Sequence, residues 1–229
     1  MDLLHAHLCD RLFAGTNVDG RVFIKDNTLY EHPISAIEYT TYDLKRDEDS
    51  IHLGFGNQGV MVYSPTLPGA EPWLYAHVVA IYHVLVYTVA NPEPKRLELL
   101  WVRWMERDST QLRGPNSSQY TRVSFVQHSG VPGEAFSFVD PSHIIRGCHL
   151  IPTFHLQRTR DQLGPSIVRD IKGDWRAFYI NRYARSACPY FGYPHLFHVC
   201  ADLPTVMPSR DFLGSELAVN DYKPLGPSK

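Results

Sequence analysis

Two long apolar segments constrain the fold of this chain more than any other feature. Residues 73–88 and 96–106 are rich in Val, Ile, Leu, Tyr and Trp, and a short turn with two prolines separates them. That composition is typical of β-strands, and the short turn indicates an antiparallel hairpin. Both faces of the second segment are largely apolar, one with Leu97, Leu99, Trp101 and Arg103 and the other with Glu98, Leu100, Val102 and Trp104. We therefore expect this strand in the centre of a barrel or packed sheet.

Prolines and glycines exclude most helical architectures. The 229 residues include 17 prolines and 15 glycines, which interrupt nearly every segment and rule out a coiled coil or helical bundle. With 44% hydrophobic and 12% aromatic residues, the chain is too apolar to be mostly disordered. The predicted fold class is β-rich α+β: a partly open β-barrel or a packed antiparallel sheet of short strands, with a short N-terminal helix.

The chain divides into three parts in this prediction. Residues 1–20 form an N-terminal helical segment, because leucines recur at helical spacing at positions 4, 8 and 12. Residues 21–183 form a single β-rich domain. Residues 184–229 form a divergent, poorly ordered C-terminal tail that carries four prolines from Pro204 onward.

Shorter segments complete the predicted domain. Strands are expected at residues 21–24, 34–44, 122–126, 135–139 and 149–154, and a strand or helix at 175–183. Residues 47–50 indicate an acidic turn, and 53–59 a plain glycine-rich loop, since no Lys-Ser/Thr ending makes it a phosphate loop. Asp140 and Pro141 are typical of the N-cap and first position of a short helix, which we expect to stop at Gly147.

Charge is distributed unevenly along the chain. A formal net charge of −2 argues against a general nucleic-acid coat protein. Residues 142–190 nevertheless carry eight basic and three acidic residues, and aromatic residues alternate with the basic ones. Such a surface could stack bases and contact phosphates, although solvated arginines around a buried aromatic strand explain it equally well. The candidate nucleic-acid-binding residues are Arg146, Arg158, Arg160, Arg169, Lys172, Arg176, Arg182 and Arg185.

A second candidate site is an aromatic pocket at the end of the predicted hairpin. Two or three aromatic rings could hold a methylated ammonium group by cation–π attraction, with a nearby acid adding charge complementarity. We favour the alternative that these rings pack in the core, because aromatic residues supply much of the core area in such domains. The candidate pocket residues are Trp73, Tyr75, Trp101, Trp104, Glu106 and Asp108.

Metal and catalytic sites are less well supported. Cys188, His195, His198 and Cys200 form a C-x6-H-x2-H-x-C cluster, but the closely spaced Cys pair usual in zinc sites is missing, and we favour buried or loop residues there. Cys148 lies beside His149, yet no nucleophile motif surrounds it, and a small core residue is the favoured interpretation. We predict no catalytic residue and no cofactor.

The cysteines and the short apolar runs indicate where in the cell the protein is located. The four cysteines are irregularly spaced, and no signal-peptide pattern opens the chain. The longest apolar run is interrupted by His77 and His83 and is shorter than a membrane helix. These features predict an intracellular protein without a membrane partner.

Short motifs follow one another in a fixed order along the chain. They are 39–43 (YTTYD) followed by 46–50 (RDEDS), 73–76 (WLYA), 100–104 (LWVRW), 138–141 (FVDP), 146–152 (RGCHLIP) and 174–175 (DW) with 179–181 (YIN). The chain is similar to an uncharacterised family of basidiomycete fungal proteins associated with Kyakuja/Dileera/Zisupton (KDZ) transposons, over residues 30–181. That resemblance implies no established activity, ligand or catalytic residue. The chain departs from the family after Asn181, where an aspartate-rich and then glycine-rich stretch is replaced, and it lacks the family's zinc-finger-like segment.

A more distant resemblance is to bromo-adjacent homology (BAH) domains, over residues 73–154. Residues 74–82 and 100–107 resemble the paired strands of those domains, and residues 144–151 resemble their short turn, Gly, Cys and strand. The resemblance implies a β-barrel-like chromatin interaction module without catalysis.

The function that we predict is a non-catalytic interaction module in a nuclear, chromatin or mobile-element context. Its expected partner is a histone tail or another protein, or DNA. One alternative is a metal-dependent or Cys/His-dependent enzyme, and another is a mobile-element relic without retained activity. The sequence leaves the ligand and the oligomeric state open.

Overall fold

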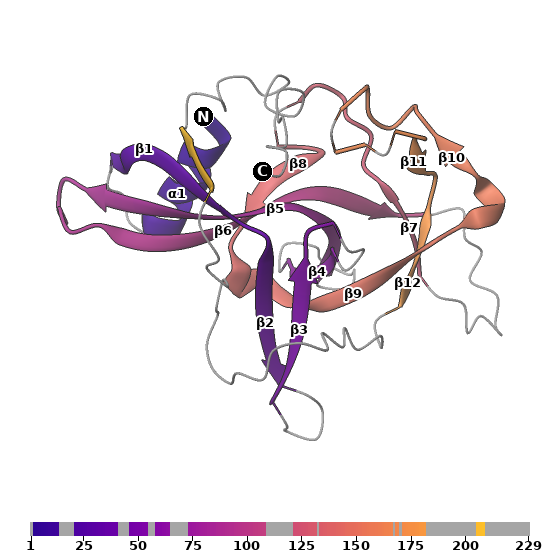
Figure 1. Cartoon of the computed structure of the whole chain (residues 1–229), viewed down its shortest axis with the longest axis horizontal. Coiled ribbons are helices and arrows are strands. Elements are labelled where there is room, and N and C mark those ends of the chain that lie inside the picture. The colour runs from indigo at the N-terminus through magenta and orange to yellow at the C-terminus, as the bar shows by residue number, and fades with distance from the viewer. Residues whose placement is uncertain are drawn as a thin grey trace, which may run out of the picture.

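The computed structural model describes residues 2–13, 21–40, 46–54, 58–64, 73–108, 121–131, 133–166, 168–169, 171–181 and 205–208. This part of the chain is mostly β-strand, with a short helix near the N-terminus and a large antiparallel sheet (Figure 1). The predicted β-rich class is therefore confirmed.

The described elements follow one another in a simple order. They are α1 (Asp2–Phe13), β1 (Val22–His32), β2 (Ile34–Thr40), β3 (Arg46–His52), β4 (Gly59–Tyr63), β5 (Trp73–Thr88), β6 (Lys95–Arg107), β7 (Arg122–Phe125), β8 (Phe136–Val139), the 3-10 turn η1 (Pro141–His143), β9 (Ile144–Pro152), the 3-10 turn η2 (Phe154–Leu156), β10 (Arg158–Thr159), β11 (Asp174–Trp175), β12 (Phe178–Asn181) and β13 (Thr205–Pro208).

The predicted hairpin forms between β5 and β6. The two strands pair antiparallel from Tyr75 opposite Met105 to Val86 opposite Lys95, with one irregularity between Val78 and Ala80. The other edge of β6 pairs with β8 and then with β7, so the strand is flanked on both sides, as its sequence predicts.

Six strands close into a ring of antiparallel pairs. β5 pairs with β4, β4 with β9, β9 with β12, β12 with β7, β7 with β6, and β6 again with β5. We call these six strands the ring. Every ring strand contributes to one apolar cluster, which consists of Met61, Tyr75, Met105, Val123, Phe125, Cys148, Leu150 and Ile180. Because successive side chains of a strand point to opposite faces, this cluster fills the interior of the ring.

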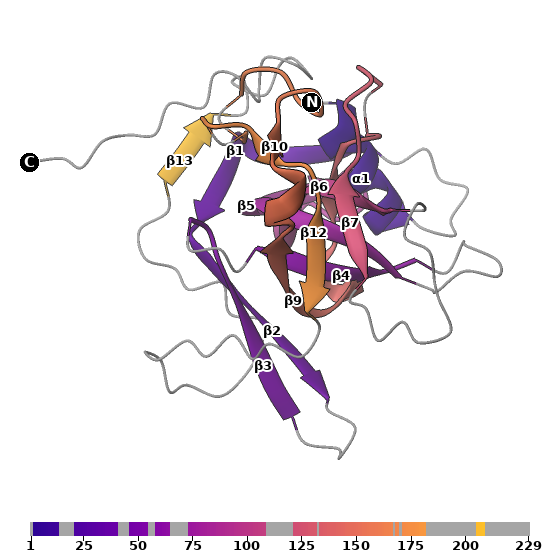
Figure 2. The ribbon, with the colours of Figure 1, turned by 90° about the vertical axis from the view of Figure 1, so that its right-hand side faces the viewer.

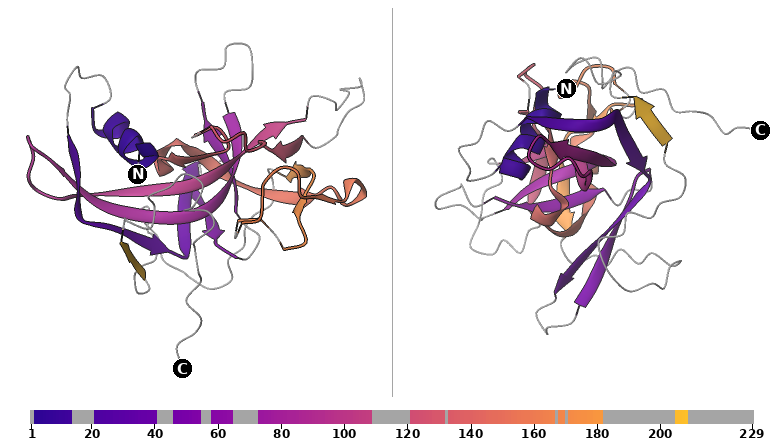
Figure 3. Two further views of the ribbon diagram at one scale, coloured as in Figure 1. Left: turned by 90° about the horizontal axis from the view of Figure 1, so that it is seen from above. Right: turned by 90° about the vertical axis from the view of Figure 1, so that its left-hand side faces the viewer.

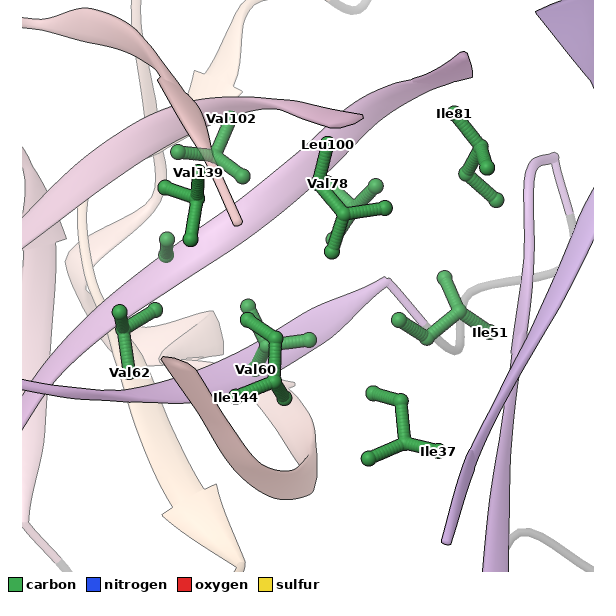
Figure 4. Packing of buried hydrophobic residues seen from close by; sticks show 11 residues of the cluster. Ile37, Ile51, Val60, Val62, Val78, Ile81, Leu100, Val102, Val139 and Ile144 are labelled. Atoms are coloured by element: carbon green, nitrogen blue, oxygen red, sulfur yellow. The ribbon is translucent and has the colours of Figure 1, made fainter. Parts of the chain in front are cut away.

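The outer face of β4, β5 and β6 is covered as well. The β2–β3 hairpin brings Ile37 and Ile51 against Val60, Val78 and neighbouring aliphatic residues (Figure 4). Beyond this contact the hairpin projects away from the ring (Figure 2). The result is a second apolar core outside the ring, which explains why both faces of β6 are apolar.

The N-terminal helix is present, as predicted from its leucine spacing. Leu4 and Leu8 are buried and pack on β1, β5 and β6. Arg11 forms an ion pair with Asp140, whose carboxylate also accepts a hydrogen bond from the Ser142 N–H at the start of η1. Asp140 is therefore the predicted N-cap, and the helix docks next to it.

Several local predictions are wrong in detail. Residues 47–50 belong to strand β3 and not to a turn, and Asp49 is 2% exposed and not solvated. Strand β4 begins at Gly59, inside the segment expected to be a loop. The short helix ends at His143, well before Gly147, because β9 already begins at Ile144.

The predicted C-terminal tail, residues 184–229, lies outside the described residues except for β13. This four-residue strand pairs antiparallel with the outer edge of β1, from Thr28 opposite Pro208 to Glu31 opposite Thr205. The sequence did not lead us to expect that pairing, since two of the tail prolines fall within or next to the segment.

The two ends of the molecule differ in composition. α1, β1 and the turn of the β5–β6 hairpin lie at one end, and β10 and β11 lie at the other (Figures 1 and 3). The second end contains most of the candidate nucleic-acid-binding residues.

Candidate nucleic-acid interface

Residues 153–177 form a small lobe between β9 and β12. The Thr153 N–H donates a hydrogen bond to the Ala177 carbonyl oxygen at 2.9 Å, which joins the start and end of the segment. Between these points lie η2, β10 and β11, and all residues except 167 and 170 are described. We call this segment the lobe.

Three side chains of the lobe form an aromatic and cationic cluster. The Phe154 ring is 68% exposed and meets the Trp175 ring edge to face, with ring centroids 5.1 Å apart and an interplanar angle of 82°. The Cζ atom of Arg158 lies 4.3 Å from the centroid of Trp175. We call Phe154, Arg158 and Trp175 the platform. Its geometry combines an exposed ring with a cation–π pair.

Backbone pairing holds the platform in place. β10 and β11 pair with Arg158 opposite Trp175, and the Arg158 Nη1 donates to the Gly173 carbonyl oxygen at 2.7 Å. The Arg176 N–H donates to the Gln157 carbonyl oxygen, which extends this pairing toward η2. The platform residues thus come from two strands and a turn that are hydrogen-bonded to one another.

Two backbone positions make this arrangement possible. Gly173 has φ +90°, and a Cβ there would lie 2.6 Å from the Thr159 carbonyl oxygen, so a side chain does not fit. Gln157 has φ 60° and ψ −169°, a region that glycine normally occupies. The strained residue directly precedes Arg158 and turns the chain from η2 into β10.

The lobe also carries exposed cations close to the platform in the sequence. Arg160, Lys172 and Arg176 are exposed; Arg176 follows Trp175 directly, and the Arg160 side chain lies close to the turn at Gly173. Arg169 is half-buried and donates to the Leu163 carbonyl oxygen. The outward charge of the lobe is therefore positive.

Of the two described acids of the lobe, Asp161 is exposed and Asp174 is buried. Asp174 is 6% exposed and pairs inward with Arg103 of β6, at 2.7 Å between Nη1 and Oδ2. Asp161 accepts a hydrogen bond from the Thr159 hydroxyl. Asp174 therefore neutralises Arg103 of β6 and does not face the solvent together with the lobe's cations.

Arg103 anchors the lobe from inside the ring. It is 1% exposed, and its guanidinium carbon lies 3.8 Å from the Phe125 ring centroid. Burial lowers the pKa of Arg103, and the Asp174 carboxylate partly opposes that effect. His77 lies opposite Arg103 in the β5–β6 register, and burial together with the Arg103 charge lowers the pKa of His77 to about 4. His77 is therefore neutral at pH 7 and adds no second positive charge beside Arg103, whose charge is compensated by the Asp174 carboxylate.

Apolar contacts attach the other side of the lobe. Leu163 packs with Ala135 and Phe136, next to Trp101. The His128 N–H also donates to the Gln162 carbonyl oxygen. The lobe is therefore attached by apolar contacts and a backbone hydrogen bond on this side, and by the Arg103–Asp174 ion pair on the other.

The remaining candidate nucleic-acid-binding residues lie elsewhere. Arg146 is near the start of β9, at the end of that strand remote from the lobe. Its Nη2 donates to the Tyr39 hydroxyl at 3.2 Å, and its Nε lies 3.5 Å from the Asp49 carboxylate. It fixes the β2–β3 hairpin to β9. Arg182 and Arg185 lie outside the described residues.

The candidate aromatic pocket residues separate into different packing clusters. Tyr75 is buried inside the ring and Trp73 packs on the same cluster, whereas Trp104 packs on the outer cluster and donates its indole N–H to the Ser137 hydroxyl at 2.8 Å. Trp101 packs near α1 and stacks against Phe136. On these contacts the structure brings together Trp73 and Tyr75 but not all four rings.

The two acids of that candidate pocket also differ in surroundings. Glu106 is exposed, whereas Asp108 pairs with Arg122 at 2.7 Å. The described contacts do not place either acid in a pocket formed by the four aromatic residues.

The candidate metal and catalytic residues are not gathered by the described part of the chain. Cys188, His195, His198 and Cys200 lie outside it. Within it, no group of three or more His, Cys, Asp or Glu residues could hold a metal ion. Cys148 is buried in the ring interior, as expected of a core residue, whereas His149 is exposed on the opposite face of β9.

The sequence did not indicate two polar features. One is the pairing of Arg103 with Asp174, which are 71 positions apart. The other is a pair of histidines, His32 and His83, whose ring nitrogens lie 2.6 Å apart, with Tyr30 stacked on His83. The apolar residues beside Arg103 in the sequence imply that Arg103 is buried. No other signal in the sequence could have indicated its pairing with Asp174.

Comparisons with protein-family models, with curated proteins and with solved structures found no match to this chain. Among the helices that the structure describes, none has the length and apolar character needed to cross a membrane. The function of the chain must therefore be inferred from the geometry of the site and from the resemblances in the sequence.

Proposed function

We propose that this protein is a non-catalytic interaction module that contacts DNA through the lobe. The observation that carries the proposal is the platform, an exposed Phe154 and a Trp175–Arg158 pair, with exposed cations close to it in the sequence. Cations contact phosphates, and an exposed aromatic ring offers a face to bases. The ring serves as the scaffold that holds the lobe.

The same geometry favours DNA over a methylated peptide tail. A methylammonium group needs aromatic faces that are open to it. In the lobe, a face of Trp175 is already covered by the Arg158 guanidinium at 4.3 Å. The candidate pocket rings around β5 and β6 are distributed over separate clusters. A cationic ligand would therefore meet competition from Arg158 and from the exposed cations of the lobe.

The two resemblances support a nuclear setting. The segments similar to BAH domains form parts of β5 and β6, which pair with each other, and of β9, which is separated from β5 by β4. BAH domains imply a chromatin module, and the fungal family implies association with mobile elements. A DNA-contacting lobe on a BAH-like barrel is compatible with either context, and we propose the nucleus as its location.

Fluorescence anisotropy with a labelled oligonucleotide tests the proposal. The test variant combines Arg160→Gln, Lys172→Gln and Arg176→Gln, all exposed in the lobe. Because phosphate contacts dominate affinity, we expect DNA binding to weaken at least tenfold at low salt. The thermal unfolding midpoint should change little, since these side chains are exposed.

The matched control neutralises three exposed cations at the other end of the molecule. Arg21→Gln, Lys25→Gln and Lys95→Gln change the net charge equally, near the start of β1 and the β5–β6 turn. The control should bind DNA within about twofold of the unmodified protein. Equal weakening in both variants, or no DNA binding by the unmodified protein, would overturn the proposal.

A further inference from the structure

We infer that the platform selects unpaired bases, so that the ligand of the lobe is single-stranded nucleic acid and not an intact duplex. This inference rests on the proposed function and names the ligand class of the same site. It starts from the exposure of Phe154 at 68% and the way its ring is supported.

The contact with Trp175 covers at most one face of the Phe154 ring. Trp175 meets it at an interplanar angle of 82°, so the two rings touch edge to face and are not stacked in parallel. A ring supported in this way keeps a flat apolar face for an incoming planar group. The bases of a duplex have both faces occupied by their neighbours, whereas an unpaired base can place its face on an aromatic ring.

A second exposed aromatic pair shows the contrast. At the other end of the molecule, Phe23 is 38% exposed and stacks on Tyr87 at 5.4 Å with an interplanar angle of 17°. One face of Phe23 is thus covered by its partner, and both acidic residues (Asp26, Glu93) and basic residues (Lys25, Lys95) are exposed on these strands and their turn. The two ends therefore both carry exposed cations, and what distinguishes the lobe is the larger exposed fraction of its ring, 68% for Phe154 against 38% for Phe23.

The platform is also fixed before any ligand arrives. Hydrogen bonds from Arg158 to Gly173, and from Arg176 to Gln157, hold the two strands that carry it. The strained backbone of Gln157 is maintained by the same contacts. A preorganised ring loses little side-chain freedom when a base stacks on it, which favours binding.

The distribution of cations fits a strand that passes over the platform. Arg176 adjoins Trp175 in sequence, and Arg160 and Lys172 lie beside the turn at Gly173, at the other end of the β10–β11 pair. A flexible single strand can follow such a short path with its phosphates near the cations while one base stacks on Phe154. The lobe therefore provides both elements of a single-strand site.

The test compares labelled 20-nucleotide single-stranded DNA with a duplex of the same sequence, using the full chain. We expect the single strand to bind at least tenfold more tightly. Phe154→Ala should weaken single-strand binding about fivefold or more and leave any duplex binding within twofold. Phe154→Trp should retain binding, and Phe154→Leu should behave as Ala, because stacking needs a ring and not merely apolar area.

Phe23→Ala is the matched control, since it removes an exposed ring at the other end of the molecule. It should leave single-strand binding unchanged. Equal affinity for duplex and single strand, or full retention of binding in Phe154→Ala while the lobe cations still matter, would overturn the inference and leave the proposed function intact. No binding of either DNA would overturn both, and tighter binding of a trimethyllysine peptide than of DNA would replace them with a peptide site.

Discussion

The ring and the lobe are stabilised in different ways. The ring encloses an apolar cluster to which all six of its strands contribute, and further apolar clusters cover its outer face. The lobe has short strands of two residues each, and it is attached through Leu163, the Arg103–Asp174 pair and a few backbone hydrogen bonds. Apolar burial tolerates small changes at many positions, whereas a few polar contacts make the lobe depend on single residues.

That difference separates scaffold from site. The long strands β5 and β6, together with an apolar cluster shared by all six strands, give the ring a stable shape, and the lobe can then expose aromatic and basic residues that a core would bury. Functional side chains carried on irregular segments and positioned by a rigid scaffold are a common arrangement in proteins. Substitutions that act on one region at a time test this distinction, beginning with the largest expected effect.

Breaking the ionic attachment of the lobe should have the largest effect. Asp174→Asn leaves the buried Arg103 cation without its carboxylate partner, and we expect the free energy of unfolding to fall by about 3–5 kcal/mol. Urea denaturation followed by circular dichroism measures this change. The double variant Arg103→Met with Asp174→Leu should recover most of the lost stability, because it removes both charges. A cost below about 1 kcal/mol for Asp174→Asn would show that the pair does not anchor the lobe.

Acidification should lower the free energy of unfolding. Burial lowers the pKa of His32, His77 and His83 to about 4 in the folded protein, whereas unfolded histidine titrates near 6.5. The unfolded state therefore binds more protons between these values, and stability falls as the pH drops from about 6.5 to about 4. We expect a loss of roughly 3 kcal/mol or more over this range.

Urea denaturation at pH 7.0, 5.5 and 4.5 measures that loss. His77→Met removes one of the three groups, and its stability should depend less steeply on pH than that of the unmodified protein. A pH-independent free energy of unfolding between 7 and 4.5 would contradict the burial of these histidines in neutral form.

A methyl group at Gly173 should distort the lobe. The position has φ +90° and its Cβ would meet the Thr159 carbonyl oxygen at 2.6 Å, so Gly173→Ala should cost about 2 kcal/mol. Gly164→Ala is the matched control, since no atom lies within 4 Å of its Cβ position and its φ is not positive. The control should be neutral or slightly stabilising. Equal effects of the two substitutions in thermal denaturation would rule out the close approach.

The smallest effect is expected from relieving strain at Gln157. Glycine adopts φ 60° and ψ −169° readily, so Gln157→Gly should raise the free energy of unfolding by about 1 kcal/mol. The same change at exposed Gln127, where φ is not positive, should lower it by about 0.5–1 kcal/mol. Urea denaturation of both variants shows whether each substitution raises or lowers the free energy of unfolding. Destabilisation in Gln157→Gly as large as in Gln127→Gly would show that the backbone at Gln157 is not strained.

The parts of the fold that could be predicted from the sequence are those with local signals. The β5–β6 hairpin has long apolar strands and a proline-containing turn, and the N-cap Asp140 precedes a proline. Strand β3 gave no such signal, because its acidic residues resemble a solvated turn. Asp49 is buried only because the Gly147 N–H and Arg146, 98 and 97 positions away, provide its partners.

The candidate site, too, could be predicted from the sequence only where the signal was local. The basic and aromatic composition of residues 142–190 was visible in the sequence, and the lobe lies within that range, but no folded lobe was predicted there. The contact of Phe154 with Trp175 depends on the pairing of two-residue strands, which have no periodicity to detect. The role of Arg146 in the β2–β3 hairpin was likewise hidden, since its partners Tyr39 and Asp49 are about a hundred positions away.

Hydrogen–deuterium exchange with and without single-stranded DNA tests the central claim most directly, because it compares the lobe and the ring in one sample. We predict slower exchange on DNA binding in peptides that cover residues 153–177, and no change in α1 or at the β5–β6 turn. Protection confined to α1, β1 or the β5–β6 turn, with exchange of the lobe unchanged, would contradict the assignment of the lobe as the binding site.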